Sequence, residues 1–337
     1  MRIGLIYDLF DDYPWQTGEV TDADAEYEPP ETVEALSAAV RSLGHEPVRI
    51  GTAFDLLRQL PNLKIDVALN IAEGARSRNR EGYAPTLLEM AGIPFLGSDA
   101  LTLSLSLDKA WTKDLAVAAG VLTPPYRSYA SALDIDPLDL PGPFPLFVKP
   151  RYEGSSKGIT PESKARDLDG LRAQVAFVNE AYRQDALVES FISGGGEFTV
   201  ALFGNDPPEV LPVLQRAIEA TTGIGLHALD RRTLPAHDWS YTLEGALSPT
   251  LEAILKHQAV RIYEKLLCKD FARLDFRVDA PGHPWFLEIN PLPTFAPDGT
   301  FAILAELAGL AYPDFLAGVL ERGLARVARE QTHSAGL

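Results

Sequence analysis

The first 97 residues alternate short apolar stretches with segments of helical period, and this order restricts the fold more than any other feature of the chain. Strands separated by helices lie parallel, because each connecting helix crosses back over the sheet. We therefore predict an α/β unit built on a parallel sheet. Its strands are expected at 2–7, 46–50 and 64–71, and its helices at 30–44, 54–60 and 84–92.

An acidic segment, residues 11–30, interrupts this unit between its first strand and its first helix. Runs of this kind are usually solvated loops, and that is our interpretation here. A loop of this length is also typical of a lid over a substrate.

The pattern changes after residue 97, where a long helix at 98–120, capped by Ser98 or Asp99, is followed by strands and helices in irregular order. We predict three units and a tail. They are an N-terminal unit at 1–97, a central unit at 98–186, a C-terminal unit at 187–330 and a frayed tail at 331–337.

The composition restricts the partners of the protein. A net charge of −17 repels the phosphate backbone of nucleic acids and the surface of an anionic membrane. The N-terminus enters a strand directly and lacks the apolar core of a signal peptide, and no apolar run is long enough to span a bilayer. We expect a soluble, cytoplasmic protein that binds neither nucleic acid nor membranes.

The stretch 273–290 reads as two strands joined by a turn, with like charges opposite each other. In that register Asp275 faces Glu288, and Arg273 faces Asn290. Facing carboxylates destabilise a sheet unless a cation lies between them or water screens them. Two carboxylates beside an amide oxygen suit a hard divalent ion such as magnesium. We favour a metal site over a pair of solvent-facing acids.

Two further stretches indicate an anion or nucleotide site. Lys149 ends a strand that leads into a small-residue loop at 153–158, whose backbone N–H groups and Lys157 can approach oxygen anions; the alternative is a flexible turn. In the stretch 187–200, Glu197 can hold ribose hydroxyls and the backbone at 190–192 can pair with a purine edge; the alternative is a Gly-rich hairpin. Neither stretch matches a Walker or Rossmann motif.

Four stretches together resemble the ATP-grasp superfamily and, within it, the D-alanine–D-alanine ligases. They are residues 87–126, 144–159, 187–204 and 273–291, and they occur in family order. The resemblance implies a combined α/β and α+β fold, in which an N-terminal parallel βαβ (pre-ATP-grasp) domain precedes two α+β lobes that clamp ATP. It also implies a homodimer.

The resemblance assigns candidate roles to residues of this sequence. It implies that Lys109 and Lys149 contact the phosphates of ATP, and that the loop with Glu153, Gly154, Ser155 and Ser156 closes over them. It also implies that Glu189, Phe191 and Ile192 flank the adenine and that Glu197 binds the ribose. It implies that two magnesium ions, with manganese as a substitute, are bound by Asp275, Glu288 and Asn290. Arg273 and Ser155 are the catalytic candidates, because they would stabilise the negative charge of the tetrahedral intermediate.

The substrate residues follow the family pattern less closely. Glu28 or Glu31 lies near the helix start where the family binds the first ammonium, and Thr300 lies in the altered segment after the hairpin. Arg76 and Arg80, with Arg78, are expected to receive an acidic substrate or to form a solvated loop. The resemblance also implies a lysine and a tyrosine in the segment between the two lobes. The candidates to take their place in this sequence are Arg216, His227, Arg231 and Arg232.

We therefore predict an ATP-dependent carboxylate–amine ligase that acts through an acyl phosphate on small molecules, most simply amino acids. Its substrate pair is expected to differ from that of the D-alanine–D-alanine ligases. The alternatives are a non-catalytic ATP-binding regulator and a ligase that uses a substrate other than an amino acid.

Overall fold

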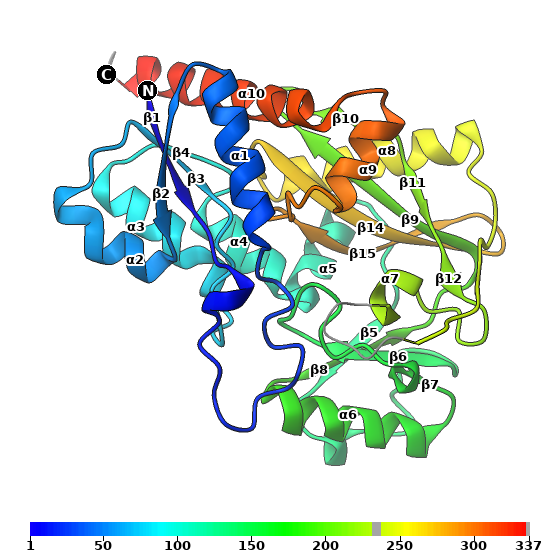
Figure 1. Cartoon of the computed structure of the whole chain (residues 1–337). Helices are drawn as coiled ribbons and strands as arrows, with labels where there is room; N and C mark the ends of the chain where they lie inside the picture. The colour runs from blue at the N-terminus through cyan, green and yellow to red at the C-terminus, as the bar shows by residue number, and fades with distance from the viewer. Residues whose placement is uncertain (231–236, 335–337) are drawn as a thin grey trace.

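The computed structural model describes residues 1–230 and 237–334. The N-terminal unit contains a parallel sheet in the order β2-β1-β3-β4, as the sequence predicts. Its strands are β1 (Arg2–Ile6), β2 (Glu46–Gly51), β3 (Val67–Asn70) and β4 (Phe95–Leu96). Helices α1 (Pro30–Ser42), α2 (Ala53–Gln59) and α3 (Tyr83–Ala91) connect the strands, as Figure 1 shows.

The second sheet is antiparallel and has the order β5-β8-β6-β7. Its strands are β5 (Tyr126–Tyr129), β6 (Leu146–Pro150), β7 (Lys164–Ala165) and β8 (Ala186–Ser190), and α6 (Leu168–Tyr182) covers one face. The expected boundary at 186–187 falls within β8, which pairs with β5 and β6. Because a strand belongs to the sheet that it pairs with, we propose to place this boundary after Ser190.

The third sheet is also antiparallel, and β9 (Gly194–Phe203) and β14 (Phe271–Asp279) form its centre. The remaining strands of this sheet are β10 (Glu209–Val210), β11 (Leu214–Arg216) and β15 (Pro284–Asn290). Helix α8 (Pro249–Lys265) packs on one face through Leu255, Ala259 and Ile262. The small elements β12 (Ile218–Glu219), α7 (Leu226–Leu229) and β13 (Tyr241–Thr242) lie between this sheet and the central unit, as Figure 1 shows.

The expected helix at 98–120 is two helices, α4 (Ala100–Leu107) and α5 (Lys109–Ala118), so the prediction of one continuous helix is wrong. The break lies at Asp108, which has an extended backbone (φ −81°, ψ 96°) and whose carboxylate accepts the N–H groups of Ala110 and Trp111. An aspartate can satisfy a new helix start in this way, and the apolar period alone does not reveal it. Asp99 caps α4 through Thr102 N–H, as expected.

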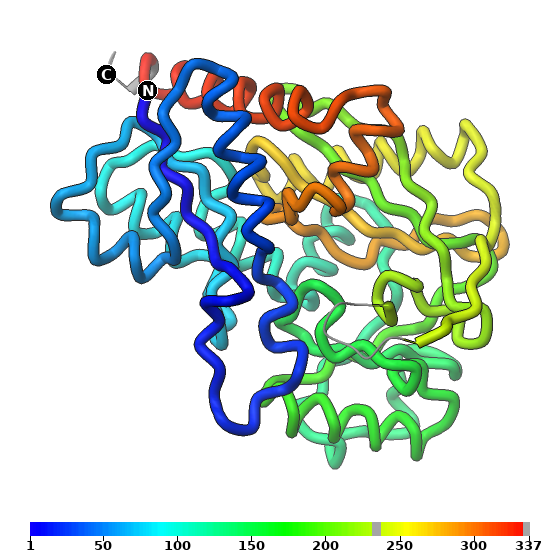
Figure 2. The backbone as a smooth tube through the Cα atoms, viewed as in Figure 1, coloured from blue at the N-terminus to red at the C-terminus, as the bar shows by residue number. Residues whose placement is uncertain are grey.

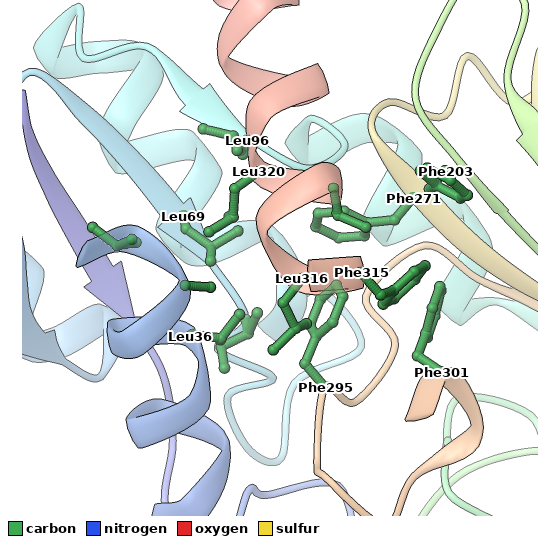
Figure 3. Close-up of a cluster of buried hydrophobic side chains, with 14 of the residues drawn as sticks. Leu36, Leu69, Leu96, Phe203, Phe271, Phe295, Phe301, Phe315, Leu316 and Leu320 are labelled. Atoms are coloured by element: carbon green, nitrogen blue, oxygen red, sulfur yellow. The ribbon is translucent and has the colours of Figure 1, made fainter. Parts of the chain in front are cut away.

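The two C-terminal helices, α9 (Thr300–Leu307) and α10 (Tyr312–Ser334), join the N-terminal unit to the third sheet. Leu36 and Leu69 of the first unit share one core with Phe271 of the third sheet and with Phe315 and Leu316 of α10, as Figure 3 shows. Helix α10 continues to Ser334, so the expected frayed tail is helical at 331–334, while residues 335–337 lie outside the described part.

Short 3-10 helices occupy five turns of the described chain, η1 (Phe10–Asp12), η2 (Leu60–Asn62), η3 (Arg80–Gly82), η4 (Ala132–Asp134) and η5 (Pro161–Ser163). Within residues 1–230 and 237–334, no single helix is long and apolar enough to cross a membrane. The two helices at 300–307 and 312–332 are bent by 102° relative to each other. Together, but not singly, they are long and apolar enough.

Candidate functional site

The hairpin of β14 and β15 has the register that the sequence predicts. Asp275 pairs with Glu288, and Arg273 pairs with Asn290. Strict alternation predicts Phe286 on the face of Glu288, and this prediction is wrong. The register shifts after Asp275, so Phe286 is fully buried in the core and Leu287 lines the same cavity as Glu288. A bulge inserts one residue into one strand and reverses the faces beyond it.

The facing carboxylates remain charged. Burial alone would raise the pKa of Asp275, but Arg273, Arg216 and a hydrogen bond from Thr199 hold that pKa below its usual value. The pKa of Glu288 is likewise lowered, because Lys109 and Lys149 outweigh the effect of burial. The Lys109 Nζ lies 3.7 Å and the Lys149 Nζ 4.0 Å from Glu288 Oε2. Each acid of this pair therefore already has a cation nearby, since Arg273 Nε also lies 3.2 Å from Asp275 Oδ2.

The donor set fits magnesium by its chemistry. Asp275, Glu288 and the amide oxygen of Asn290 are oxygen donors on adjoining positions, which is the ligand type that magnesium prefers. The described residues contain no cluster of three or more His, Cys, Asp or Glu side chains that could hold a metal. A metal here would thus rely on two carboxylates, an amide and oxygen atoms from outside the protein.

A cavity between the second and third sheets continues from these acids to an apolar end. Its apolar lining includes Phe147, Ile159, Phe191, Ile192, Ile224 and Leu287, and its polar lining includes Lys149, Glu197, Asp275 and Glu288. Lys164 and Arg277 lie over the ring of Phe191, at 4.0 and 4.6 Å from its centroid. The cavity offers an apolar surface for a flat ring at one end and charged groups at the other.

A buried charge cluster fixes the lysines of this cavity. Glu189 Oε1 lies 3.0 Å from Lys149 Nζ, and Glu189 Oε2 lies 2.6 Å from Lys113 Nζ. The carboxylate of Glu189, expected beside adenine, thus faces the two lysines, while the residue still lines the cavity. Sequence reasoning missed Lys113, whose side chain is 0% exposed. Burial, only partly offset by Glu189, lowers the pKa of Lys113 to about 8.

The loop at 153–158 lies beside Glu288 and contacts Lys109. The Lys109 Nζ donates to the backbone carbonyl of Glu153, which ties the start of α5 to this loop. Ser155 and Ser156 both have positive φ, 44° and 58°. Consecutive residues in this region are uncommon for side chains other than glycine, and such backbone conformations occur often at functional sites. Gly154 and Ser155 line a second cavity with Glu288 and Asn290.

The second half of the acidic segment is not a solvated loop, because Asp22, Asp24, Glu26 and Glu28 are all buried, whereas residues 14–18 are exposed as expected. Figure 2 shows it extending from the N-terminal unit beside the central unit. Glu26 Oε1 accepts Gly154 N–H, and its Oε2 lies 2.6 Å from Lys157 Nζ. The segment therefore packs on the 153–158 loop, as the alternative interpretation of a lid requires. Sequence reasoning missed these contacts, because the sequence does not reveal which loop an acidic segment meets.

Two of the three arginines expected to receive an acidic substrate are already paired with carboxylates, whereas Arg78 lies over the rings of Trp111 and Tyr152. Arg80 is buried, and its Nη2 contacts both carboxylate oxygens of Glu26, at 2.6 and 2.8 Å. Arg76 Nε donates to Glu19 at 2.7 Å. Because both guanidinium groups already have a carboxylate partner, the structure gives no support to either as the receptor of an acidic substrate.

The remaining substrate candidates are Glu28 just before α1, Glu31 in its first turn and Thr300 at the start of α9. Glu28 accepts hydrogen bonds from Thr32 and Thr294, and burial raises its pKa to about 7, whereas Glu31 is exposed. Thr300 accepts a hydrogen bond from Arg216 Nη2 at 2.6 Å.

Two of the candidates for the space between the lobes lie near Asp275. Arg216 and His227 both act electrostatically on the Asp275 carboxylate, and His227 lines the apolar cavity. The other two candidates, Arg231 and Arg232, lie outside the described residues.

Residues 141–321 match the family model described as the D-ala D-ala ligase C-terminus. A D-alanine–D-alanine ligase of Stutzerimonas stutzeri is 33% identical over 290 residues, which cover 86% of this chain and 88% of the relative. An uncharacterized protein of Sinorhizobium fredii, y4sG, is 30% identical over 320 residues, which cover 91% of this chain and 88% of the relative.

Solved structures share the fold. A D-alanine–D-alanine ligase of Bacillus anthracis complexed with ATP has a TM-score of 0.70 at 22% identity, and the match covers 98% of this chain and 99% of that one. The VanG D-Ala:D-Ser ligase of Enterococcus faecalis has a TM-score of 0.68 at 20% identity, over 96% of this chain and 99% of that one. The fold of this chain is therefore the fold of these ligases.

Proposed function

Because the chain belongs to the D-alanine–D-alanine ligase family and has the ATP-grasp fold, we propose that it uses ATP to join a carboxylate to an amine. The products are an amide, ADP and phosphate. The proposed substrate pair differs from two molecules of D-alanine. The observation that carries the proposal is the facing pair of Asp275 and Glu288, which lies within reach of Lys109 and Lys149.

In this proposal the cavity between the second and third sheets binds the nucleotide. Phe191, Ile192 and Leu287 contact the adenine ring, and Glu197 accepts hydrogen bonds from the ribose. Lys149 and Lys109 contact the phosphates, and the 153–158 loop, with Glu153, Gly154, Ser155 and Ser156, closes over them. Glu189 fixes the position of Lys149, since both groups are buried and paired.

The chemistry requires a better leaving group than oxide. Transfer of the γ-phosphoryl group to the carboxylate produces an acyl phosphate, and charge neutralisation by lysines favours this step. The amine nitrogen then attacks the acyl carbon, and the C–O bond to phosphate breaks. Arg273 and the donors of the Ser155 loop stabilise the oxyanion that forms between these events. Closure of the loop keeps water away from the acyl phosphate.

Asp275, Glu288 and Asn290 are the proposed ligands of two magnesium ions, for which manganese can substitute. Magnesium, when bound, neutralises charge on the phosphoryl group that is transferred. We further propose that the protein acts in the cytoplasm, as a homodimer, on small-molecule substrates. The net charge of −17 supports the absence of nucleic-acid partners.

The test replaces Glu288 by glutamine, which keeps the shape and removes the charge. We expect ADP release, measured by a coupled assay across a panel of acids and amines, to fall by about 10²–10³-fold. Manganese binding in the presence of ADP, followed by electron paramagnetic resonance, is expected to weaken in parallel, while the circular dichroism spectrum is unchanged. Glu264→Gln, at an exposed position of α8, is the control.

Two outcomes would contradict the proposal. Normal turnover and manganese binding in Glu288→Gln would exclude the metal assignment. A wild-type protein that binds ATP but releases no ADP with any pair of substrates would support the alternative of a non-catalytic regulator.

A further inference from the structure

Two carboxyl groups beside the proposed transfer site have no cationic partner. Glu73 follows β3, and Glu81 lies in η3; both line the cavity that also contains Lys109, Glu288 and Asn290. Across residues 1–230 and 237–334, neither carboxylate has a hydrogen bond, nor an ion pair within 4.0 Å. The Glu81 residue is only 6% exposed. A buried carboxylate without a partner is costly, so this arrangement needs an explanation.

The cations nearest to these acids are already engaged. Arg80 binds both oxygens of Glu26 and donates to the Tyr152 carbonyl at 2.9 Å. Lys157 pairs with Glu26 and with Glu153. Glu26 and Glu153 therefore take up the charges of Arg80 and Lys157. Neither cation is left to form an ion pair with Glu73 or Glu81.

The two acids also act on each other. Burial, followed by the charge of Glu81, raises the pKa of Glu73 well above its usual value. Burial raises the pKa of Glu81 to about 7, although Arg80 opposes this shift. The chain is nevertheless held firmly here, because Gly74 N–H donates to Asp8 Oδ2 at 2.7 Å. Two acids that line one cavity and have no cation of the described chain within ion-pair distance form a site suited to a positive charge.

We propose that Glu73 and Glu81 bind a second, protonated amino group of the amine substrate, so that the acceptor is a diamine or a diamino acid. The inference rests on the ligase function proposed above and specifies its substrate class. An acceptor with one amino group offers these acids no cation while that group reacts, because the attacking nitrogen must be neutral, whereas a diamine brings a second group that stays an ammonium ion.

In the reaction, one amino group enters neutral and attacks the acyl carbon of the acyl phosphate. The C–N bond forms, the C–O bond to phosphate breaks, and the proton lost by nitrogen leaves with the phosphate. The other amino group stays protonated between the two carboxylates and holds the nucleophile in place.

The experiment compares acceptors that differ only in the second amino group. Wild-type protein, ATP, magnesium and a panel of carboxylic acids are incubated with 1,4-diaminobutane or butylamine, and with 2,4-diaminobutyrate or 2-aminobutyrate. ADP release gives kcat/KM, and mass spectrometry identifies the amide. We expect each diamine to be preferred at least about 30-fold over its partner, and Glu81→Gln and Glu73→Gln to remove most of that preference.

A binding measurement keeps the test independent of turnover. We expect 1,4-diaminobutane to raise the Tm of the wild type in the presence of ADP, and to raise it less in Glu81→Gln. The control Glu89→Gln, at an exposed position of α3, should behave like the wild type in both assays.

Failure of this inference differs from failure of the proposed function. Ligation of monoamines and diamines at similar rates would overturn the diamine site but leave the ligase intact. Stabilisation by potassium or magnesium ions alone that Glu81→Gln abolishes would also overturn it, in favour of a metal site. Absence of ADP release with every acceptor would refute the ligase itself, and unchanged diamine binding in both glutamine variants would then refute the site as well.

Discussion

The burial and charge of single residues at this site are set by the side chains that they contact in the folded protein. Lys113 shows this most clearly. Its fully buried ammonium group lies 2.6 Å from the Glu189 carboxylate and donates a hydrogen bond to the Thr123 hydroxyl at 2.9 Å. In the sequence it lies four residues after Lys109 on a helix, a place where most lysines are exposed. Local pattern therefore could not identify it, whereas the pair of Asp275 and Glu288 follows from strand alternation and a turn alone.

We expect Lys113→Met to destabilise the protein by about 2–4 kcal/mol, because it removes one of the two cations that compensate buried Glu189. Loss of the lysine should also raise the KM for ATP, since Lys149 is then held differently. Urea unfolding measures the first effect and steady-state kinetics the second. Adding Glu189→Gln to this variant should recover part of the stability, and strictly additive losses in the double variant would show that the pair is not coupled.

Glu28 provides a pH-dependent prediction. Burial raises its pKa from 4.5 to about 7, so between these values the folded state binds more protons than the unfolded state. Its contribution is therefore greatest at low pH, and stability is lost as the pH rises from about 4.5 to about 7. We expect Glu28→Gln to lack this loss and to gain up to about 3 kcal/mol relative to the wild type at pH 8.

The measurement is the free energy of unfolding in urea at pH 5 and pH 8. Exposed Glu31→Gln, three residues further on in the first turn of α1, is the matched control and should follow the wild type. A difference between Glu28→Gln and the wild type that is the same at both pH values would contradict the raised pKa.

At the scale of secondary-structure elements, the sequence predicts which helices and strands form better than it predicts where a helix breaks or a strand bulges. The parallel sheet, the helix cap at Asp99, the end of a helix at Gly92 and the β14–β15 hairpin all follow from period and turn residues. The break at Asp108 and the bulge near Leu287 do not, because each is stabilised by tertiary contacts. Arg151 binds both oxygens of Asp108 at 2.8 Å, and this contact spans 43 residues.

We expect the helix break at Asp108 to position Lys109. Asp108→Ala removes the cap of α5 and the partner of Arg151, and we expect it to cost about 1–2 kcal/mol of stability. It should also raise the KM for ATP, because Lys109 is the first residue of α5. Asp99→Ala, which removes the cap of α4, is the control for stability loss alone. An equal change of KM in both variants would show that capping at Asp108 does not position Lys109.

At the scale of the whole molecule, the sequence predicts the order of the units but not how they share their interiors. The first and third units have one common core, which α10 completes, whereas the second sheet has its own core with α6. Asp270 illustrates the join, since it binds Gly97 N–H at the end of β4 and Arg326 of α10. Contacts between segments more than 150 residues apart leave no periodic signal, so the sequence could not reveal this shared core.

The shared core implies that the first and third units unfold together. Arg326→Met leaves the buried carboxylate of Asp270 without its cation, and we expect a loss of about 3–5 kcal/mol. Amide hydrogen exchange should show β1 and β14 losing protection to the same extent, because they pack on one core, while β6 keeps more of its protection. Asp270→Asn combined with Arg326→Met should restore part of the loss. Loss of protection confined to α10, with β1 and β14 unchanged, would mean that the helix detaches without loosening either sheet.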